Sequence, residues 1–231
     1  IVSGVTSPNS NVVILVDGKE VLRKRADSRG DYSVVVDAIA RGVYTFGVYS
    51  LDADNNKSST FSTSFTVTGA RTSALSNINI APTIKVSPDP VNPGQVLSLS
   101  GYGLINSTVT IENEKDGSSA SRKQLTVATD GSGAWSTTLD TNGFSVGTYK
   151  VRTKAVQDGG VSTNFSNYTF YGVGQSAVRP TNADLNRDGK VNLVDFSILL
   201  FWWNTNGGTS DPSADINGDA KVNLVDFSIL L

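Results

Sequence analysis

One segment near the end of the chain occurs twice, and this repeat constrains the fold more than any other feature. Residues 184–200 recur as residues 215–231. The copies differ at only three aligned positions: Leu185/Ile216, Arg187/Gly218 and Gly189/Ala220. Each copy places oxygen-bearing side chains at loop positions 1, 3 and 5 and a carboxylate at position 12. This spacing lets a short loop surround one hard cation with oxygen ligands, which suits calcium.

The loop spacing assigns a role to each predicted calcium ligand. Side-chain oxygens come from positions 1, 3 and 5, and a backbone carbonyl from position 7. Position 9 acts directly or through a water, and the position 12 carboxylate closes the site. In the first copy the ligands are Asp184, Asn186, Asp188, Lys190, Asn192 and Asp195. In the second they are Asp215, Asn217, Asp219, Lys221, Asn223 and Asp226.

Two other interpretations of these loops are less favoured. Clusters of Asp, Asn and Gly also form ordinary turns. Two copies in register, each followed by the same apolar helix-forming segment, favour a metal site over such turns. Magnesium is disfavoured because it prefers octahedral sites that retain several waters.

The segments before the two loops are unsuited to helices, so neither unit is a complete EF-hand. Residues 179–182 contain Pro180, and residues 204–212 are rich in Gly, Asn and Thr and end in Pro212. Each unit is therefore predicted to be a loop followed by one helix. A duplicated unit of this kind, over residues 183–231, resembles the dockerin family. The resemblance implies a non-catalytic module whose calcium-held helix pair docks onto a cohesin module of another protein.

The resemblance also implies a partner-binding surface. In dockerins it is formed by loop positions 10 and 11 and by residues further along the helix. The corresponding residues here are Leu193, Val194, Leu200, Phe201, Leu224, Val225 and Leu231. Better-known dockerins often carry Ser or Thr at the first pair of positions and Lys or Arg at the second. This chain departs from that pattern, which implies a more apolar contact.

Helical spacing sorts the apolar residues of the first helix into two faces. Recurrence at i, i+3, i+4 and i+7 predicts an inner stripe of Phe196, Leu199, Leu200 and Trp203. A neighbouring face carries Val194, Ser197, Ile198 and Phe201. A module this small cannot bury every apolar side chain, so we expect the surplus to form an exposed interface patch. Because the copies are nearly the same, rotating the module by half a turn would present nearly the same face. We therefore hypothesise that a partner can bind the module in two orientations.

Composition excludes several classes of function. The chain of 231 residues has a formal net charge of −2 and no basic run, so we expect no nucleic-acid partner. It contains no Cys, His or Met, which excludes disulfides, thiolate sites, Ser-His-Asp triads and HExxH zinc sites. We therefore expect no catalytic residues, no cofactor other than calcium and no enzymatic activity. No apolar run is long enough to span a membrane.

The chain before the repeat is predicted to consist of short β-strands separated by turns. An Asp17-Gly18 hairpin joins strands 12–16 and 20–22. The other expected strands are 32–36, 43–51, 60–67, 96–101, 108–112, 123–128, 134–139, 148–155 and 164–171. Landmarks recur, since residues 27–33 match residues 130–136, and both stretches place an aromatic residue after a turn. Both modules resemble bacterial Ig-like β-sandwich domains, in which Tyr32 and Trp135 would be core residues.

We therefore expect a mainly β fold, with two tandem Ig-like β-sandwiches followed by a small α-helical dockerin module with two EF-hand-like calcium loops. The expected sandwiches cover residues 1–69 and 83–173. Linkers cover residues 70–82 and 174–182, and the dockerin covers residues 183–231. Ile78 and Ile80 in the first linker would suit an additional edge strand.

Three functions are compatible with this organisation. The leading hypothesis is a non-catalytic secreted or cell-surface protein that attaches through the calcium-dependent dockerin to a cohesin-like partner, with the Ig-like domains as spacer. One alternative is a structural subunit of an extracellular filament or surface layer, joined to neighbouring copies of itself. Another is a non-catalytic arm of a larger glycoside hydrolase. All three place the chain outside the cell or on its surface.

The two loops differ where the chain must turn sharply. The first copy has Gly189 at this position and the second has Ala220. A left-handed conformation costs a non-glycine residue roughly 1–2 kcal/mol. We predict that the second site binds calcium more weakly or is locally distorted. A calcium titration that resolves the two sites tests this, and a looser first site would contradict it.

Overall fold

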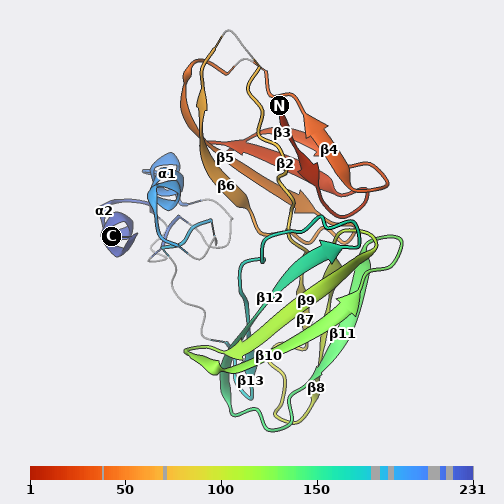
Figure 1. The fold of residues 1–231 in the computed structure, drawn as a ribbon. Helices are drawn as coiled ribbons and strands as arrows, with labels where there is room; N and C mark the ends of the chain where they lie inside the picture. The colour runs from red at the N-terminus through yellow and green to blue at the C-terminus, as the bar shows by residue number, and fades with distance from the viewer. Residues whose placement is uncertain are drawn as a thin grey trace.

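The structure, a computed structural model, describes residues 1–37, 39–69, 72–177, 183–186, 190–207, 214–216 and 221–230. It contains two β-sandwiches in succession, followed by two short helices (Figure 1). The predicted fold class is thereby confirmed. No helix in the described ranges is both long and apolar enough to cross a lipid bilayer.

The first sandwich packs a four-stranded sheet of order β3-β2-β5-β6 over the pair β1-β4. The strands are β1 (Val2–Val5), β2 (Asn11–Val16), β3 (Lys19–Arg25), β4 (Asp31–Val34), β5 (Gly42–Leu51) and β6 (Phe61–Val67). Alternate residues of a strand point to opposite faces, so each sheet contributes one set of apolar side chains to the interior. Ile14, Val48 and Tyr32 belong to this core and are buried.

The chain after β6 returns along the first sandwich before it enters the second. Ile78 N–H donates to the Ser3 carbonyl (3.1 Å), and Ile80 N–H donates to the Val5 carbonyl (2.9 Å). Both isoleucines are buried in the first core, and the Tyr32 hydroxyl donates to the Ile78 carbonyl (2.7 Å). This segment is therefore hydrogen-bonded to β1 without forming a regular strand. The division of the chain into domains given above stays a prediction.

The second sandwich pairs a sheet of order β10-β9-β12-β13 with a sheet of order β11-β8-β7. The strands are β7 (Lys85–Ser87), β8 (Val96–Tyr102), β9 (Ser107–Lys115), β10 (Ser118–Ala128), β11 (Ala134–Asp140), β12 (Gly147–Gln157) and β13 (Thr169–Val173). Leu97, Leu99, Ile111 and Trp135 are buried between the sheets. The core positions predicted for Tyr32 and Trp135 are both confirmed.

Strand prediction failed where side-chain hydroxyls share the pairing along β12 with the backbone. Residues 164–171 were expected to form one strand, but β13 begins only at Thr169. Upstream of it, the Ser166 hydroxyl accepts from Thr153 N–H (2.9 Å), and the Thr163 hydroxyl accepts from Ala155 N–H (3.1 Å). These hydroxyls satisfy the edge of β12 without a regular strand. The short strands β1 and β7 were not predicted.

One repeated turn explains why the two modules share sequence landmarks. The Asp27 carboxylate accepts from Arg29 N–H (2.8 Å) and Asp31 N–H (2.9 Å). The Asp130 carboxylate accepts from Ser132 N–H (2.8 Å) and Ala134 N–H (3.0 Å) in the same arrangement. Each turn ends immediately before an inward aromatic residue. The matching sequences therefore form the same turn, which leads into β4 in the first sandwich and β11 in the second.

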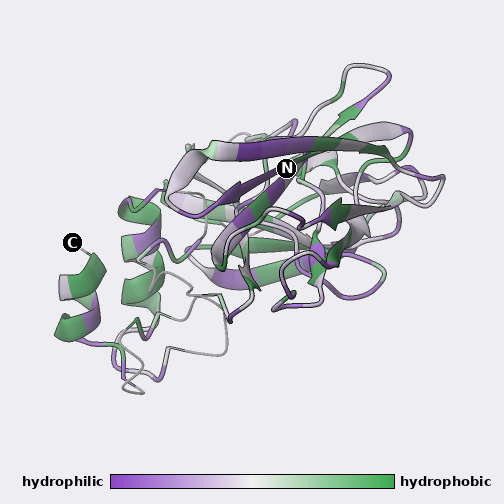
Figure 2. Ribbon diagram, turned by 90° about the horizontal axis from the view of Figure 1, so that it is seen from below, coloured by the Kyte–Doolittle hydropathy of each residue, from purple (hydrophilic) through white to green (hydrophobic). Residues whose placement is uncertain are grey.

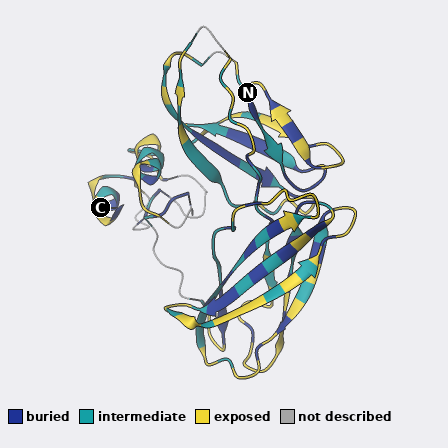
Figure 3. Ribbon diagram, in the orientation of Figure 1, coloured by how far each residue is buried: buried dark blue, intermediate teal, exposed yellow. Residues whose placement is uncertain are grey.

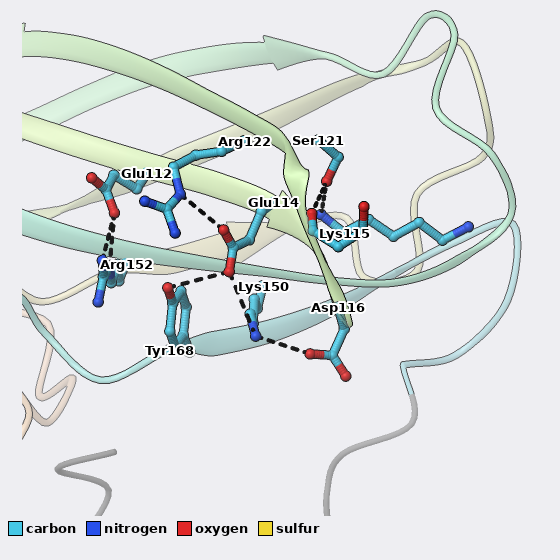
Figure 4. A network of polar contacts seen from close by, with 10 residues as sticks. Glu112, Glu114, Lys115, Asp116, Ser121, Arg122, Lys150, Arg152 and Tyr168 are labelled. Carbon is cyan, nitrogen blue, oxygen red and sulfur yellow. Dashed lines mark hydrogen bonds and ion pairs between the residues drawn. The ribbon is translucent and has the colours of Figure 1, made fainter. Parts of the chain in front are cut away.

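A network of paired charges covers the outer face of the larger sheet in the second sandwich (Figure 4). At its centre, the Glu114 carboxylate accepts from Arg122 Nε (2.9 Å) and from the Tyr168 hydroxyl (3.3 Å). Lys150 Nζ lies 3.6 Å from Glu114 and 3.1 Å from Asp116. Burial alone would raise the pKa of Glu114, but the hydrogen bond and charge of Arg122 and the charge of Lys150 hold it below its usual value.

This lowered pKa predicts how stability depends on pH. A carboxylate whose folded pKa lies below its unfolded value, about 4.3 for Glu, stabilises the fold above that value. The contribution is lost as pH falls through the folded pKa. The free energy of unfolding should therefore fall between neutral and acidic pH, and we predict a smaller fall for Glu114→Gln than for the wild type. Urea unfolding at the two pH values measures it. Glu20→Gln is the control, because the Glu20 side chain is 44% exposed and its ion pair with Arg23 should contribute little. Equal acid sensitivity of wild type and Glu114→Gln would contradict the prediction.

Candidate functional site

Helix α1 (Leu193–Phe201) begins at a capping box that fixes the Asp195 side chain. The N-cap residue Asn192 has an extended backbone, and its side-chain oxygen accepts from Val194 N–H (2.8 Å). Asp195 Oδ2 accepts in return from Asn192 N–H (2.8 Å). Reciprocal bonds of this kind satisfy N–H groups that a helix start leaves without partners. The carboxylate is thereby held over the N-terminus of α1.

The second oxygen of Asp195 joins the helix to the loop that precedes it. Asp195 Oδ1 accepts from Asn186 N–H (3.1 Å), and the Asp195 side chain is fully buried. Asp184 and Asn186 are also buried. The predicted ligands at positions 1, 3 and 12 of the first copy are thus all withdrawn from solvent. By contrast, Lys190, predicted to contribute only its carbonyl, is exposed.

The second copy repeats this anchor at helix α2 (Leu224–Leu230). Asp226 is fully buried, and its carboxylate accepts from Asn223 N–H (2.8 Å) and Ile216 N–H (2.7 Å). In the first copy the N–H group that the loop donates belongs to Asn186, at loop position 3. In the second copy it belongs to Ile216, at loop position 2, which aligns with Leu185. Asp215 is half-buried, whereas its counterpart Asp184 is buried. The two loops are similar but not equivalent.

The predicted ligands that the structure describes are suited to a hard cation. They are carboxylate, amide and carbonyl oxygens, and the chain contains no His or Cys to add a softer ligand. A buried carboxylate is costly unless it is hydrogen-bonded and its charge is neutralised, and a bound cation would neutralise it. Within the described residues, no group of three or more carboxylates is close enough to hold a metal by itself. The predicted ligands Asp188, Asn217 and Asp219 lie outside the described residues, as do Gly189 and Ala220.

The two copies pack against each other through equivalent residues. Phe196 and Phe227 occupy the same position in each copy, and their ring centroids lie 5.4 Å apart at 48°. Val222 N–H donates to the Thr205 carbonyl (2.8 Å), and Asn204 N–H donates to the Val222 carbonyl (2.9 Å). The chain beyond α1 is thus tied to the second loop. The buried core of the module comprises Leu185, Leu199, Ala214, Ile216, Val222 and Leu230.

Exposed residues lie on both helices, and many of the helix residues are apolar, as the burial and hydropathy colours show (Figures 2 and 3). Among the predicted partner-binding residues, Leu193 is 78% and Leu224 is 69% exposed. Leu200, Phe201 and Val225 are also exposed, Val194 is half-buried, and Leu231 lies outside the described residues.

The inner-stripe prediction was correct for Leu199, which is buried, and wrong for Leu200, which faces solvent. Phe196 and Trp203 are half-buried. The core of the module lies on the side of α1 that carries Phe196 and Leu199, so the stripe is narrower than the helical pattern predicts.

Sequence reasoning missed one polar contact and one apolar residue. Asn167, in the second sandwich, donates from Nδ2 to the Asn186 carbonyl in the first loop (3.1 Å). No local pattern indicates this contact, because it depends on how the module lies against the sandwich. Ile229 is exposed on α2 beside Val225. Its counterpart Ile198 had been placed on the neighbouring face of the first helix, so the repeat itself was the signal that could have identified Ile229.

Residues 182–231 match the family model of the dockerin type I domain. No curated protein matches the chain.

Several solved structures resemble the chain at low identity. A tetra-tandem repeat in the extending region of a large adhesion protein is 20% identical, with a TM-score of 0.33, over 72% of this chain and 42% of that one. Dimeric latent PorU from Porphyromonas gingivalis is 18% identical, with a TM-score of 0.33, over 73% and 16%. The fibronectin(III)-like modules of Clostridium thermocellum CbhA are 12% identical, with a TM-score of 0.25, over 78% and 90%. The chain thus spans less than half of the first two.

Asp195 caps helix α1 and is also a predicted calcium ligand, so a substitution there should affect both roles. Asp195→Asn keeps the size of the side chain but removes the charge that a cation would require, so calcium stoichiometry should fall by one. At a thousandfold excess of calcium over Kd, the variant should lose about 4 kcal/mol of calcium-dependent stabilisation. In chelator the change in stability should be much smaller, because Asn keeps one side-chain oxygen that can accept an N–H group of the cap and carries no buried charge. Calorimetric titration measures the calcium stoichiometry, and thermal unfolding with calcium or chelator measures the stabilisation.

Two further variants complete this test. Asp226→Asn should give the same result for the second copy. Asp158→Asn removes an exposed carboxylate of the second sandwich and should change neither quantity. Unchanged calcium stoichiometry in Asp195→Asn would contradict the assignment.

Proposed function

Because residues 182–231 form a dockerin type I domain, we propose that this chain attaches to a cohesin module through its calcium-ordered helix pair. Dockerin type I domains bind calcium, and a dockerin domain implies calcium-dependent cohesin binding. The observation that carries the proposal is the buried carboxylate that fastens loop to helix in each copy. The two β-sandwiches serve as a non-catalytic spacer for this attachment point. The chain works outside the cell or on its surface.

Calcium is proposed to order the docking surface rather than to touch the partner. The twelve predicted ligands form two sites, of which the second is weaker. Each ion would neutralise the carboxylate at the start of a helix and hold the loop oxygens around it. Because Phe196 and Phe227 follow immediately after Asp195 and Asp226, ordering the loops also orders the contact between the helices. Loss of calcium should therefore separate the two copies and remove the surface that they share.

The proposed contact with the partner is mainly apolar. Among the described residues of the module, Leu193 and Leu224, the first residues of α1 and α2, are the most exposed large apolar ones. A contiguous group of exposed apolar side chains commonly marks a protein interface. Apolar contacts carry no charges for dissolved ions to screen, whereas contacts between exposed charges are screened. The cohesin complex should therefore depend strongly on calcium and weakly on ionic strength.

The outer face of the second sandwich does not compete as a functional site. Its charged groups are paired with one another, as Arg152 donates to Glu112 from Nε (3.0 Å) and Nη2 (2.7 Å). Arg152 also lies over the rings of Phe165 and Tyr168. Groups engaged in this way stabilise a sheet surface. This pairing supports a spacer role for the sandwich.

Binding to a recombinant type I cohesin module, measured by calorimetry, tests the proposal. The full chain should bind in calcium, lose binding in chelator and recover it when calcium is restored. Leu224→Asp should weaken binding at least about tenfold, because a charge would enter an apolar contact. Val96→Asp is the matched control, since Val96 is a similarly exposed apolar residue (56%) in the second sandwich. Binding that persists in chelator would overturn the proposal.

A further inference from the structure

The larger sheets of the two sandwiches have equivalent strand orders but differ at one edge. In the second sandwich, the last strand, β13, pairs with β12 on one side and bonds to the segment between β7 and β8 on the other. Val91 N–H donates to the Gly172 carbonyl (3.0 Å), and the Val91 carbonyl accepts from Gly174 N–H (2.8 Å). The Asp89 carboxylate accepts from Gly172 N–H (2.9 Å). Residues 89–91 therefore close this edge, and Val91 runs parallel to β13.

The corresponding edge of the first sandwich is formed by β6 (Figure 1). The Gly-x-Tyr start of β5 matches that of β12, which aligns the β5–β6 pair with the β12–β13 pair. In this alignment Thr66 takes the place of Gly172, and Thr68 takes the place of Gly174. Among the residues that the structure describes, only β5 pairs with β6. The segment that closes β13 thus has no counterpart on β6 in the described part of the chain.

The pairing pattern shows which backbone groups of β6 face outwards. Asp17 N–H donates to the Thr45 carbonyl (2.8 Å), so the backbone groups of Thr45 are directed towards β2. In an antiparallel pair, the residue opposite such a position also directs its N–H and C=O away from the shared ladder. That residue is Ser64, and Thr66 lies two positions further along with the same direction. Helix α1 comes near β6, but Ser64 and Thr66 are both exposed, so another strand can reach them.

The sequence of β6 lacks the residues that commonly protect a sheet edge. Such edges are often blocked by charged residues, above all Lys, or by Pro. β3, at the opposite edge of the same sheet, carries Lys19, Lys24 and Arg25. β6 reads Phe-Ser-Thr-Ser-Phe-Thr-Val, without charge and without Pro. An edge of this kind is suited to strand addition, in which an extended segment joins a sheet through backbone hydrogen bonds.

An apolar cavity of about 290 Å³ lies beside this edge. Phe46, Phe65 and Val67 contribute to its lining. In the second sandwich the residue at the place of Val67 is Val173, which belongs to the core in which Val91 is fully buried. A cavity of roughly 150 Å³ is already enough for a benzene molecule. The cavity beside β6 therefore has room for an apolar side chain of an added strand.

We propose that β6 is a docking site for an extended segment of a separate polypeptide, which adds to the first sandwich as a parallel strand. The segment would carry Asp two residues before Val, because this arrangement closes β13. Its Asp carboxylate would accept from Thr66 N–H, and its Val N–H would donate to the Thr66 carbonyl. The Val side chain would enter the cavity. This inference goes beyond cohesin binding and does not depend on it, since it gives the first sandwich an attachment point of its own.

Titration of the chain with a synthetic peptide of residues 86–94 tests the proposal. This peptide contains Asp89 and Val91. The isotope-labelled full chain in calcium is followed by amide NMR at peptide concentrations up to about 1 mM, where even weak binding is measurable. The amide signals of Thr66 and Thr68 should shift, and hydrogen exchange of the Thr66 amide should slow at least about tenfold. Signals of β6 that stay unchanged at the highest peptide concentration would overturn the proposal.

Two controls establish that the peptide adds at this edge. The amides of Gly172 and Gly174 should not shift, because their edge is already closed. A peptide with Val91→Asp should bind at least about tenfold more weakly, because a charge would have to enter the apolar cavity. Equal binding of the two peptides, or equal shifts at both sandwiches, would mean non-specific association and would count against the docking site.

A pair of variants at one position tests the backbone contact. Thr66→Pro removes the outward N–H group but no bond of the β5–β6 ladder, and edge strands tolerate Pro at such positions. It should weaken binding of the wild-type peptide at least about tenfold, whereas Thr66→Val keeps the N–H group and should bind as the wild type does. Thermal unfolding checks that both variants are folded. If Thr66→Pro does not fold, the titrations of the wild-type chain with the two peptides still decide the outcome.

A second copy of the chain is the other occupant that the test can reveal. Sedimentation of the chain without peptide should show no association through β6. Concentration-dependent dimers in which the Thr66 amide shifts would mean that a second copy occupies the edge, and would overturn the proposed occupant. Cohesin binding is measured separately and should be the same with and without the peptide, so failure of this inference leaves the proposed function intact.

Discussion

The terminal module depends on a buried carboxylate at the start of each helix. Asp195 accepts backbone N–H groups with both oxygens, one from the helix cap and one from the loop. Asp226 does the same in the second copy. A fully buried charge is tolerated only where hydrogen bonds and an opposite charge compensate it. The proposed calcium ions would provide that charge, which would make the helix starts, the loops and the Phe196–Phe227 contact depend on one another.

The repeat shows how nearly identical sequences can have different surroundings in one chain. Both copies carry the same residues from Lys190 or Lys221 to the first helical turns. The first copy is restrained by Gly18 and Asn167, which belong to the two sandwiches. Its Val194 is half-buried, whereas Val225 is exposed. Two-fold pseudosymmetry within the module is therefore broken by the remainder of the chain.

Sequence alone predicted much of the fold where the determinants are local. The Asp17-Gly18 hairpin, the turns at Asp27 and Asp130 and the buried aromatics Tyr32 and Trp135 all follow from short patterns that the structure reproduces. Prediction failed where contacts are distant in sequence. Near Ser166, hydroxyl groups take over part of the pairing that a regular strand would make. Leu200 faces solvent because the core of the module lies on the other side of α1. The calcium ligands were assigned from spacing and stay a prediction, as do the partner-binding residues.

The contacts between the sandwiches bear on the proposed spacer role. The Thr83 hydroxyl donates to the buried Asp52 carboxylate (2.6 Å), and Asn79 Nδ2 donates to the Ser162 carbonyl (2.9 Å). Together with the bond from Asn167 N–H to Ser59, these directional contacts tie the two sandwiches together near their junction. The same Asn167 also holds the first loop. A spacer connected in this way would fix the direction in which the attachment point faces, as well as its distance.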